Sequence, residues 1–368
     1  MPGAAVVRFT HLLAKNWRNF PRVDVELGGR VFLAGPSAAG KSNFLDIFRF
    51  LGDLAAPGLG FQESVRMRGG VRRLRCLAAR QNSDLGLVVH AGAGLNPTEW
   101  EYELHFNQED QPLPLIKGER LSRCGEDLVV RPDESDAADP ERLCHTALEQ
   151  GGLHKEWRDF AAFLRTVRYV NPIPQRMREP GGSAILDQMA ATPERSRQAR
   201  LRMIQETLQG AVPQLMQLEA VRDSHGRPHL RALYEHWRPR GAWQSEDQLA
   251  DGTLRLIGIL WAVLDGSGPL LIEEPETSLH PQIVRLLPKM LSRRSPRQTF
   301  LTTHSPDLLC GEDVETAEIL ILNPHEEGTT IRPAFDLQEA ADLLDHGILA
   351  IDAPEPADDR QMNLFGTD

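Results

Sequence analysis

Short apolar runs, separated by glycine, proline and charged residues, recur along the whole chain and predict a mixed α/β fold. Residues 5–14, 22–27 and 30–34 have the composition of strands. Residues 98–106 alternate apolar and polar positions with a period of two, as a half-exposed antiparallel strand does. These segments predict a β-rich first lobe.

The middle of the chain changes to helical spacing. Apolar residues at 142–165 and 193–210 recur as on one face of a helix, and 215–237 has the pattern of a strand pair. Residues 249–264 open with an Asp-Gly turn and continue as an apolar helix. Because no heptad repeat is sustained before that helix, we expect a short helical lid and no long coiled-coil arm.

Two further segments have the pattern of buried strands that end in polar residues. The run at 269–272 ends in Glu273 and Glu274, and the run at 298–303 ends at His304. Desolvating an unpaired carboxylate costs several kcal/mol, so a cation is expected beside the two glutamates. If the two runs are neighbouring strands of one sheet, His304 lies at the same edge.

The composition is that of a globular cytoplasmic protein. The chain has 368 residues, 41% of them hydrophobic, which is enough for a large core. Its four cysteines form no Cys-x-x-Cys pair, which argues against a zinc knuckle or a disulfide framework. The longest apolar run, 256–264, is about half a membrane span, so no membrane association is expected.

The net charge of −11 is unevenly placed. Nine acidic residues and one arginine follow residue 335 and give −8 of the total. The rest of the chain is close to neutral, so its overall acidity does not exclude a polyanionic partner.

The expected cation is Lys41. The segment after the strand at 30–34 contains Gly-x-x-x-x-Gly-Lys-Ser and runs into a helical pattern, which is the context of a Walker A loop. Its backbone N–H groups are expected to surround the β-phosphate of ATP, with Lys41 on the β and γ oxygens and Ser42 on Mg²⁺. The predicted nucleotide-binding residues of the loop are Gly35, Pro36, Ser37, Ala38, Ala39, Gly40, Lys41, Ser42 and Asn43.

The run at 269–272 then becomes the Walker B strand. Glu273 is expected in the Mg²⁺ shell, Glu274 is expected to orient or deprotonate the attacking water, and His304 is expected near the γ-phosphate. The helix N-terminus in the segment Leu249, Ala250, Asp251, Gly252, Thr253 is suited to meet the phosphate of an ATP held by another subunit.

In this order the motifs resemble the ABC-type ATPases of the RecF/SMC group, and more narrowly the stand-alone AAA-type ATPases related to the OLD family. The resemblance covers about residues 5–335 and includes Asn16-Trp-Arg-Asn-Phe20, which adds Arg18 and Asn19 to the nucleotide site. It implies a P-loop ABC-type ATPase head with a parallel-sheet core. It also implies a homodimer that holds two nucleotides, each between the Walker A loop of one subunit and the signature segment of the other.

The chain departs from the group at two positions. Ala250 replaces a signature serine whose hydroxyl reaches the opposing γ-phosphate, and Ser37 replaces an asparagine. Losing one charge-assisted hydrogen bond costs on the order of 1.5–3 kcal/mol, which would slow turnover without abolishing nucleotide binding.

The expected organisation is a first ATPase lobe with Walker A at 1–165, a lid at 166–240, a second lobe with signature, Walker B and His304 at 241–335, and an acidic flexible tail at 336–368. The part of the sequence after His304 has no acidic cluster or His/Asp nuclease pattern. Any cutting is therefore expected to belong to a partner.

Two segments point to macromolecular partners. An arginine cluster could contact DNA phosphates or be a solvated, internally paired face; it comprises Arg66, Arg68, Arg72, Arg73 and Arg75. The tail contains a short peptide that resembles those docking on bacterial sliding clamps, but a Leu-Phe pair could equally fold back onto the body; its key residues are Gln361, Leu364 and Phe365.

The sequence therefore predicts an ATP-driven switch that acts on DNA or on a separate effector, in genome maintenance or phage defence. The alternative is a module that binds ATP, hydrolyses it poorly and gates a partner nuclease or toxin, as the missing signature hydroxyl indicates. The motor subunit of a membrane transporter is disfavoured, because neither the lid nor the segment at 16–20 matches such subunits.

Overall fold

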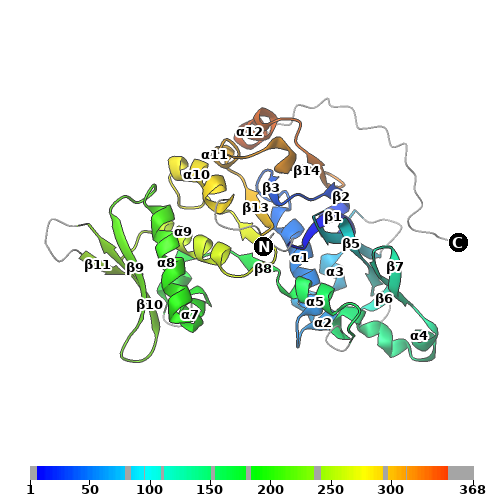
Figure 1. Ribbon diagram of the computed structural model, residues 1–368. Helices are drawn as coiled ribbons and strands as arrows, with labels where there is room; N and C mark the ends of the chain where they lie inside the picture. The colour runs from blue at the N-terminus through cyan, green and yellow to red at the C-terminus, as the bar shows by residue number, and fades with distance from the viewer. Residues whose placement is uncertain are drawn as a thin grey trace.

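Two six-stranded sheets and one three-stranded sheet make up the framework of the protein (Figure 1). The structure is a computed structural model, and it describes residues 6–78, 84–94, 96–108, 112–150, 154–179, 184–235, 242–292, 297–311 and 313–346.

The first sheet is antiparallel, with strand order β2-β1-β4-β5-β6-β7. The alternation predicted for residues 98–106 is confirmed in β5, where Trp100, Tyr102, Leu104 and Phe106 are buried. The strands are β1 (Arg8–Trp17), β2 (Phe20–Glu26), β4 (Leu85–Ala93), β5 (Asn96–Asn107), β6 (Leu115–Arg123) and β7 (Glu126–Arg131).

The second sheet has the order β15-β14-β3-β13-β12-β8 and is parallel except for the β14–β15 hairpin. β3 and β13 are almost wholly buried, because the sheet is covered on both faces. The strands are β3 (Arg30–Ala34), β8 (Arg168–Val170), β12 (Leu270–Glu273), β13 (Thr299–Thr303), β14 (Ile319–His325) and β15 (Gly328–Pro333).

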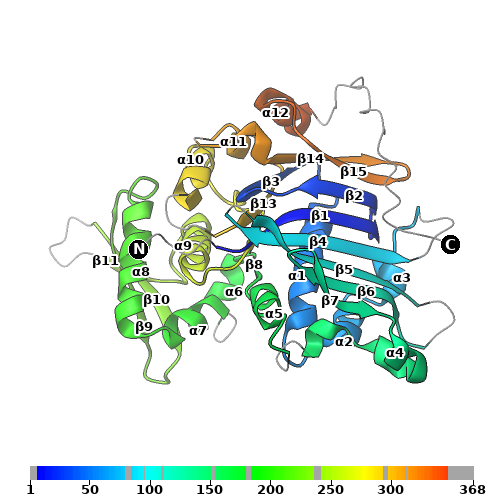
Figure 2. The same ribbon diagram turned by 45° about the vertical axis from the view of Figure 1, so that its right-hand side comes forward.

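Helix α1 (Lys41–Ala55) lies between the two large sheets. Phe44, Phe48 and Leu51 of α1 belong to one core cluster together with residues of the antiparallel sheet and with Phe300 of the parallel sheet. Figure 2 shows α1 behind the strands of the antiparallel sheet. This packing holds the start of α1, where the phosphate-binding loop ends, in a fixed position.

Most of the remaining helices cover the two large sheets, and α7 and α8 pack with the three-stranded sheet. The α-helices are α2 (Gly60–Met67), α3 (Val71–Leu74), α4 (Glu134–Ala138), α5 (Arg158–Arg165), α6 (Pro174–Arg178), α7 (Ala184–Ala191), α8 (Glu194–Leu208), α9 (Asp251–Leu264), α10 (Pro281–Ser292), α11 (Pro306–Leu309) and α12 (Leu337–His346). Three 3₁₀ segments are η1 (Pro140–Cys144), η2 (Ala147–Gln150) and η3 (Thr316–Glu318). In the part of the chain described here, the longest helices have 15 residues, in keeping with the expected lack of a coiled-coil arm.

A separate unit of α7, α8 and the three-stranded sheet projects at the end of the molecule away from the antiparallel sheet (Figures 1 and 2). Its strands are β9 (Leu215–Arg222), β10 (Pro228–Tyr234) and β11 (Ala242–Ser245). The predicted helix at 193–210 and strand pair at 215–237 are both found here, in α8 and in β9 with β10. The segment predicted to form a short helical lid therefore contains a three-stranded sheet as well as helices.

Two further expectations need correction. In the described part of the segment 142–165, α-helix is confined to α5, which packs against α1, and two short 3₁₀ turns precede it. The lid boundary at residue 166 also falls too early, because β8 pairs with β12 and so belongs to the parallel sheet. None of the helices described is long and apolar enough to cross a membrane.

Candidate nucleotide-binding site

The loop between β3 and α1 has the backbone that its glycines predict. Gly40 caps α1 with a φ of 100°, in the left-handed region that favours glycine. A Cβ at Gly40 would lie 2.1 Å from Nδ2 of Asn19, and one at Gly35 would lie 2.9 Å from the carbonyl oxygen of Leu322. Larger residues at either position would displace the neighbouring chain and deform the loop.

Lys41 points back into this loop. Its Nζ donates to the carbonyl oxygens of Gly35 at 2.8 Å and Pro36 at 2.9 Å. Burial lowers the pKa of the Lys41 ammonium, and the nearby carboxylates of Glu274 and Glu276 oppose that shift. The lysine thus supplies the positive charge predicted beside the glutamates.

Asn19 braces the loop from the β1–β2 turn. Its Nδ2 donates to the carbonyl of Ala39 at 2.9 Å and to Oγ1 of Thr329 at 2.8 Å, and its Oδ1 accepts from Nδ2 of Asn43 at 2.7 Å. Arg18, predicted to contact the nucleotide, donates to Asp46 at 2.8 Å. Asn19 is therefore integral to the loop, while the charge of Arg18 is already paired.

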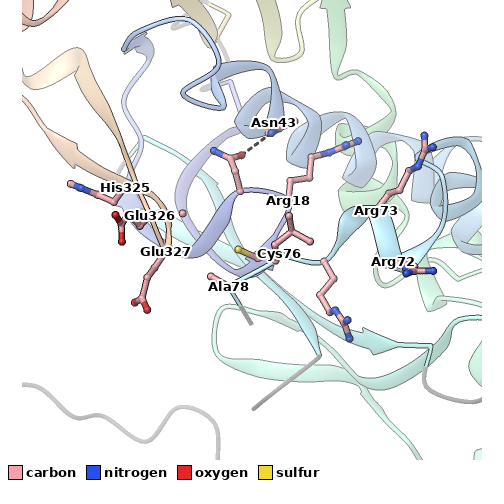
Figure 3. Close-up of a pocket in the computed structure, with 13 residues that line it drawn as sticks. Arg18, Asn43, Arg72, Arg73, Cys76, Ala78, His325, Glu326 and Glu327 are labelled. Atoms are coloured by element: carbon pink, nitrogen blue, oxygen red, sulfur yellow. Dashed lines mark hydrogen bonds between the residues drawn. The ribbon is translucent and has the colours of Figure 1, made fainter. Parts of the chain in front are cut away.

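A cavity of about 670 Å³ opens beside Asn43, at the end of the loop. In Figure 3, His325, Glu326 and Glu327 of the β14–β15 turn lie on one side of it, and Arg72 and Arg73 on the other. The cavity is lined by Arg18, Asn19, Asn43, Arg72, Arg73, Arg75, Cys76, Leu77, Ala78, His325, Glu326, Glu327 and Gly328. It adjoins the α1 N-terminus and has a strongly cationic wall.

This geometry divides the arginine cluster. Arg68 is removed from the predicted DNA contacts, because its side chain is only 6% exposed and pairs with Asp46 and Asp53. Arg66 pairs with Glu63 on the surface. The other three, Arg72, Arg73 and Arg75, are exposed and line the cavity beside the phosphate-binding loop.

Glu273 ends β12 next to Ser42. The Ser42 hydroxyl donates to one Glu273 oxygen, and the Tyr169 hydroxyl donates to the other. Burial and the Glu273 carboxylate raise the pKa of Tyr169 to about 12, so the phenol stays protonated at neutral pH. Tyr169 was not predicted from the sequence, because nothing near it in the chain indicates that β8 lies beside the Walker B strand.

Glu274 and His304 lie together at the carboxyl ends of β12 and β13. His304 Nδ1 is 3.4 Å from Glu274 Oε1. Glu274 has a φ of 41°, and its N–H donates to Oγ1 of Thr302 at 3.1 Å. Holding a non-glycine residue in this region costs free energy, which functional sites frequently accept. The parallel pairing of the two strands places His304 at the same edge of the sheet as Glu274.

Glu276, which was not predicted from the sequence, accepts a hydrogen bond from the backbone of His304. Its buried carboxylate accepts from Oγ1 of Thr303 at 2.7 Å and from the His304 N–H at 3.0 Å. The signal was present, because Glu276 follows the Walker B pair by two residues.

Ser42 and Glu273 suit Mg²⁺. A hydroxyl and a carboxylate are hard oxygen donors, and Mg²⁺ in nucleotide sites is typically held by one or two such groups together with substrate phosphates. In the described ranges, no group of three or more His, Cys, Asp or Glu residues forms a metal site by itself. The donor set therefore fits a metal that arrives with a nucleotide.

Helix α9 begins at Asp251, within the signature segment. Ala250 is its N-cap residue, and no side chain accepts a hydrogen bond from the first N–H groups of the helix. Arg178 of α6 donates to the Leu249 carbonyl at 2.7 Å and pairs with Asp251. A Cβ at Gly252 would lie 2.7 Å from the carbonyl oxygen of Ser278, so this turn tolerates only glycine without rearrangement. The segment is thus clamped from one side.

One turn further along α9, Arg255 ties the signature helix to the Walker B loop. Its buried guanidinium donates to the Glu274 carbonyl at 3.0 Å and to the Pro172 carbonyl at 3.1 Å. Burial lowers the pKa of Arg255, and the Walker B carboxylates oppose the shift. Like Arg178, Arg255 was not singled out from the sequence.

Fold and motifs together have the form of a P-loop, ABC-type nucleotide-binding head similar to those of the RecF/SMC group. The chain belongs to the family described as "AAA domain, putative AbiEii toxin, Type IV TA system", whose model matches residues 30–310. No curated protein matches the chain significantly.

Solved structures with a similar fold include SMC head domains. The SMC head domain from Thermotoga maritima has a TM-score of 0.52 at 13% identity, over 89% of this chain and 99% of that one. The SMC head bound to the C-terminal winged-helix domain of ScpA gives 0.52 at 14%, over 90% and 99%. The SMC head with an extended coiled coil from Pyrococcus furiosus, bound to the C-terminal domain of ScpA, gives 0.50 at 10%, over 92% and 99%. The predicted fold class is thus confirmed.

Proposed function

We propose that this protein binds ATP with Mg²⁺ and hydrolyses it as a switch. The observation that carries the proposal is the meeting of three motifs at one sheet edge. Lys41 and Ser42 begin α1, Glu273 contacts Ser42, and Glu274 lies 3.4 Å from His304. These residue types in this arrangement match the positioning and charge needs of phosphoryl transfer.

Each residue has a role in this proposal. The loop N–H groups and the α1 N-terminus receive the β-phosphate, and Lys41 exchanges the Gly35 and Pro36 carbonyls for phosphate oxygens. Mg²⁺, held by Ser42 and Glu273, would neutralise charge on the β- and γ-phosphates. Glu274 accepts the proton of the attacking water, and His304 contacts the γ-phosphate.

The adenosine part of ATP occupies the cavity beside Asn43. A purine nucleoside continues outward from the α-phosphate, and the cavity opens where the loop ends. Arg72, Arg73 and Arg75 then meet the base, the ribose or the α-phosphate, through stacking or charge. In this proposal the three exposed arginines bind the nucleotide, whereas the sequence predicted that they contact DNA.

ATP also joins two subunits in the proposed mechanism. The signature segment of one copy closes the site of the other, so the nucleotide completes the dimer. Ala250 offers no hydroxyl to the opposing γ-phosphate, so only the backbone N–H groups of the α9 N-terminus serve there. Closure and opening of this dimer transmit the nucleotide state to DNA or to a separate effector.

A specific observation favours a second candidate, in which the protein binds ATP, hydrolyses it poorly and gates a partner nuclease or toxin. The observation is the uncapped start of α9 at Ala250. ATP turnover with and without duplex, nicked and single-stranded DNA tests both. Turnover that DNA stimulates supports the DNA switch, negligible turnover with tight ATP binding supports the gating module, and the lack of any nucleotide binding refutes both.

The sliding-clamp contact remains a prediction. Gln361, Leu364 and Phe365 lie outside the described residues, and the proposal for the ATPase head does not depend on them.

A further inference from the structure

Tyr169 occupies an unusual place at the edge of the parallel sheet. It lies on β8, opposite Leu271 of the Walker B strand, and β8 pairs with no other described strand. Its ring is half-buried, packs against the main core and lies under the guanidinium of Arg49, whose central carbon is 4.3 Å from the ring centroid. The ring is therefore held in position independently of its hydroxyl.

The hydroxyl has one acidic partner, Glu273. The carboxylate receives a hydrogen bond on each oxygen, from Ser42 on one side and from Tyr169 on the other. These two contacts fix the rotation of the carboxylate about its last bond. The Ser42 hydroxyl would exchange its contact with Glu273 for the metal ion when a nucleotide binds. Tyr169 contacts the other oxygen of Glu273 and would keep its hydrogen bond.

We propose that Tyr169 is a positioning residue for Mg²⁺, which orients Glu273 so that one oxygen faces the metal while the other is held by the phenol. This inference rests on the proposed function of the site. Groups that hydrogen-bond to metal ligands commonly set metal affinity, and their removal weakens it by roughly 10- to 100-fold. Tyr169 fits this description through the hydrogen bond of its hydroxyl to Glu273; the same hydroxyl also interacts with the side chain of Asn171, and both contacts can be deleted while the ring keeps its packing.

The test is Mn²⁺ binding by Tyr169→Phe, measured by electron paramagnetic resonance in the presence of a non-hydrolysable ATP analogue. The substitution keeps the ring and its contact with Arg49 and removes only the hydroxyl. The apparent Kd for Mn²⁺ is expected to rise about tenfold or more. Binding of the same analogue in EDTA is expected to stay at the wild-type level, because the loop and Lys41 are untouched.

Tyr102→Phe is the matched control. Tyr102 donates to the buried carboxylate of Glu119 at 2.9 Å, so this variant also deletes a tyrosine–carboxylate hydrogen bond, but in the antiparallel sheet. It is expected to lower thermal stability and leave the Kd for Mn²⁺ unchanged.

The outcomes distinguish a failure of the positioning role of Tyr169 from a failure of the proposed nucleotide site. Wild-type Mn²⁺ affinity, or tighter binding, in Tyr169→Phe overturns the positioning role while the proposed nucleotide site stands. Equal weakening in Tyr102→Phe also overturns it, since the effect would then be general destabilisation. If the wild-type protein binds the analogue neither with Mn²⁺ nor in EDTA, the proposed function itself fails.

Discussion

Restoring a serine at position 250 is expected to raise both stability and turnover, for two separable reasons. Ala250 is the N-cap of α9, with φ −62° and ψ 145°, and no side chain accepts from the first N–H groups of the helix. These dihedral angles are the ones that capping serines adopt, and replacing alanine with serine at an N-cap is worth about 1 kcal/mol. For a chain of this size that corresponds to about 2 °C in Tm.

The turnover gain comes from the opposing γ-phosphate. A hydroxyl that reaches it makes a hydrogen bond to a charged group, worth on the order of 1.5–3 kcal/mol, which corresponds to roughly 10- to 100-fold in rate if it is made only in the transition state. Sharing the hydroxyl with the α9 cap places the expected gain near tenfold. Steady-state phosphate release and nucleotide-free thermal unfolding measure the two effects independently.

Ala250→Asp separates capping from phosphate contact. Aspartate caps helices as well as serine does, but its charge repels a γ-phosphate. The aspartate variant should therefore match the serine variant in stability and turn over ATP more slowly than the wild type. If serine leaves turnover unchanged while stabilising the fold, or if both variants hydrolyse ATP equally fast, α9 does not meet a γ-phosphate and the reasoning is wrong.

Two further sets of variants test the arginines of the cavity and the contact of Arg178 with the signature segment. Arg72→Ala with Arg73→Ala should raise the Kd for ATP about tenfold and reduce its salt dependence, while Arg66→Ala, on the same surface but outside the cavity, should have no effect; a loss of DNA binding with unchanged ATP affinity would assign the cluster to DNA. Arg178→Ala should leave ATP binding intact and slow turnover about tenfold, because the signature loop loses its hydrogen bond to the Leu249 carbonyl, whereas the exposed Arg176→Ala on the same helix should behave as wild type; equal effects of the two would show that α6 merely stabilises the fold.

The local motifs of the site were predictable because each consists of residues that are consecutive or closely spaced in the sequence. The loop at 35–43 needs glycine at fixed offsets, and the Walker B run shows its buried strand and terminal carboxylates directly. The position of His304 was predicted on the condition that β12 and β13 are neighbouring strands, and their parallel pairing meets that condition. These features depend on chain order or on composition alone.

The missed residues act across long sequence separations. Tyr169 reaches Glu273 only because a three-residue strand joins the sheet edge, and Arg68 is buried only because α2 brings it onto Asp46 and Asp53 of α1. No local pattern encodes either contact. The segment 142–165 was predicted as helical from the spacing of its apolar residues. In the structure these residues pack on α1 from short 3₁₀ turns as well as from helix α5, and the spacing alone does not distinguish the two.

Sedimentation velocity of Glu274→Gln with ATP and Mg²⁺ tests the central claim most directly. Glutamine keeps the size of the side chain but cannot accept the proton of the attacking water, so the nucleotide should persist and hold two subunits together. A matched variant that adds Lys41→Ala removes the phosphate contact and should remain monomeric under the same conditions. The account predicts a dimer that forms only with ATP and only while Lys41 is present; a monomer at every protein and ATP concentration, or a dimer indifferent to both, would contradict it.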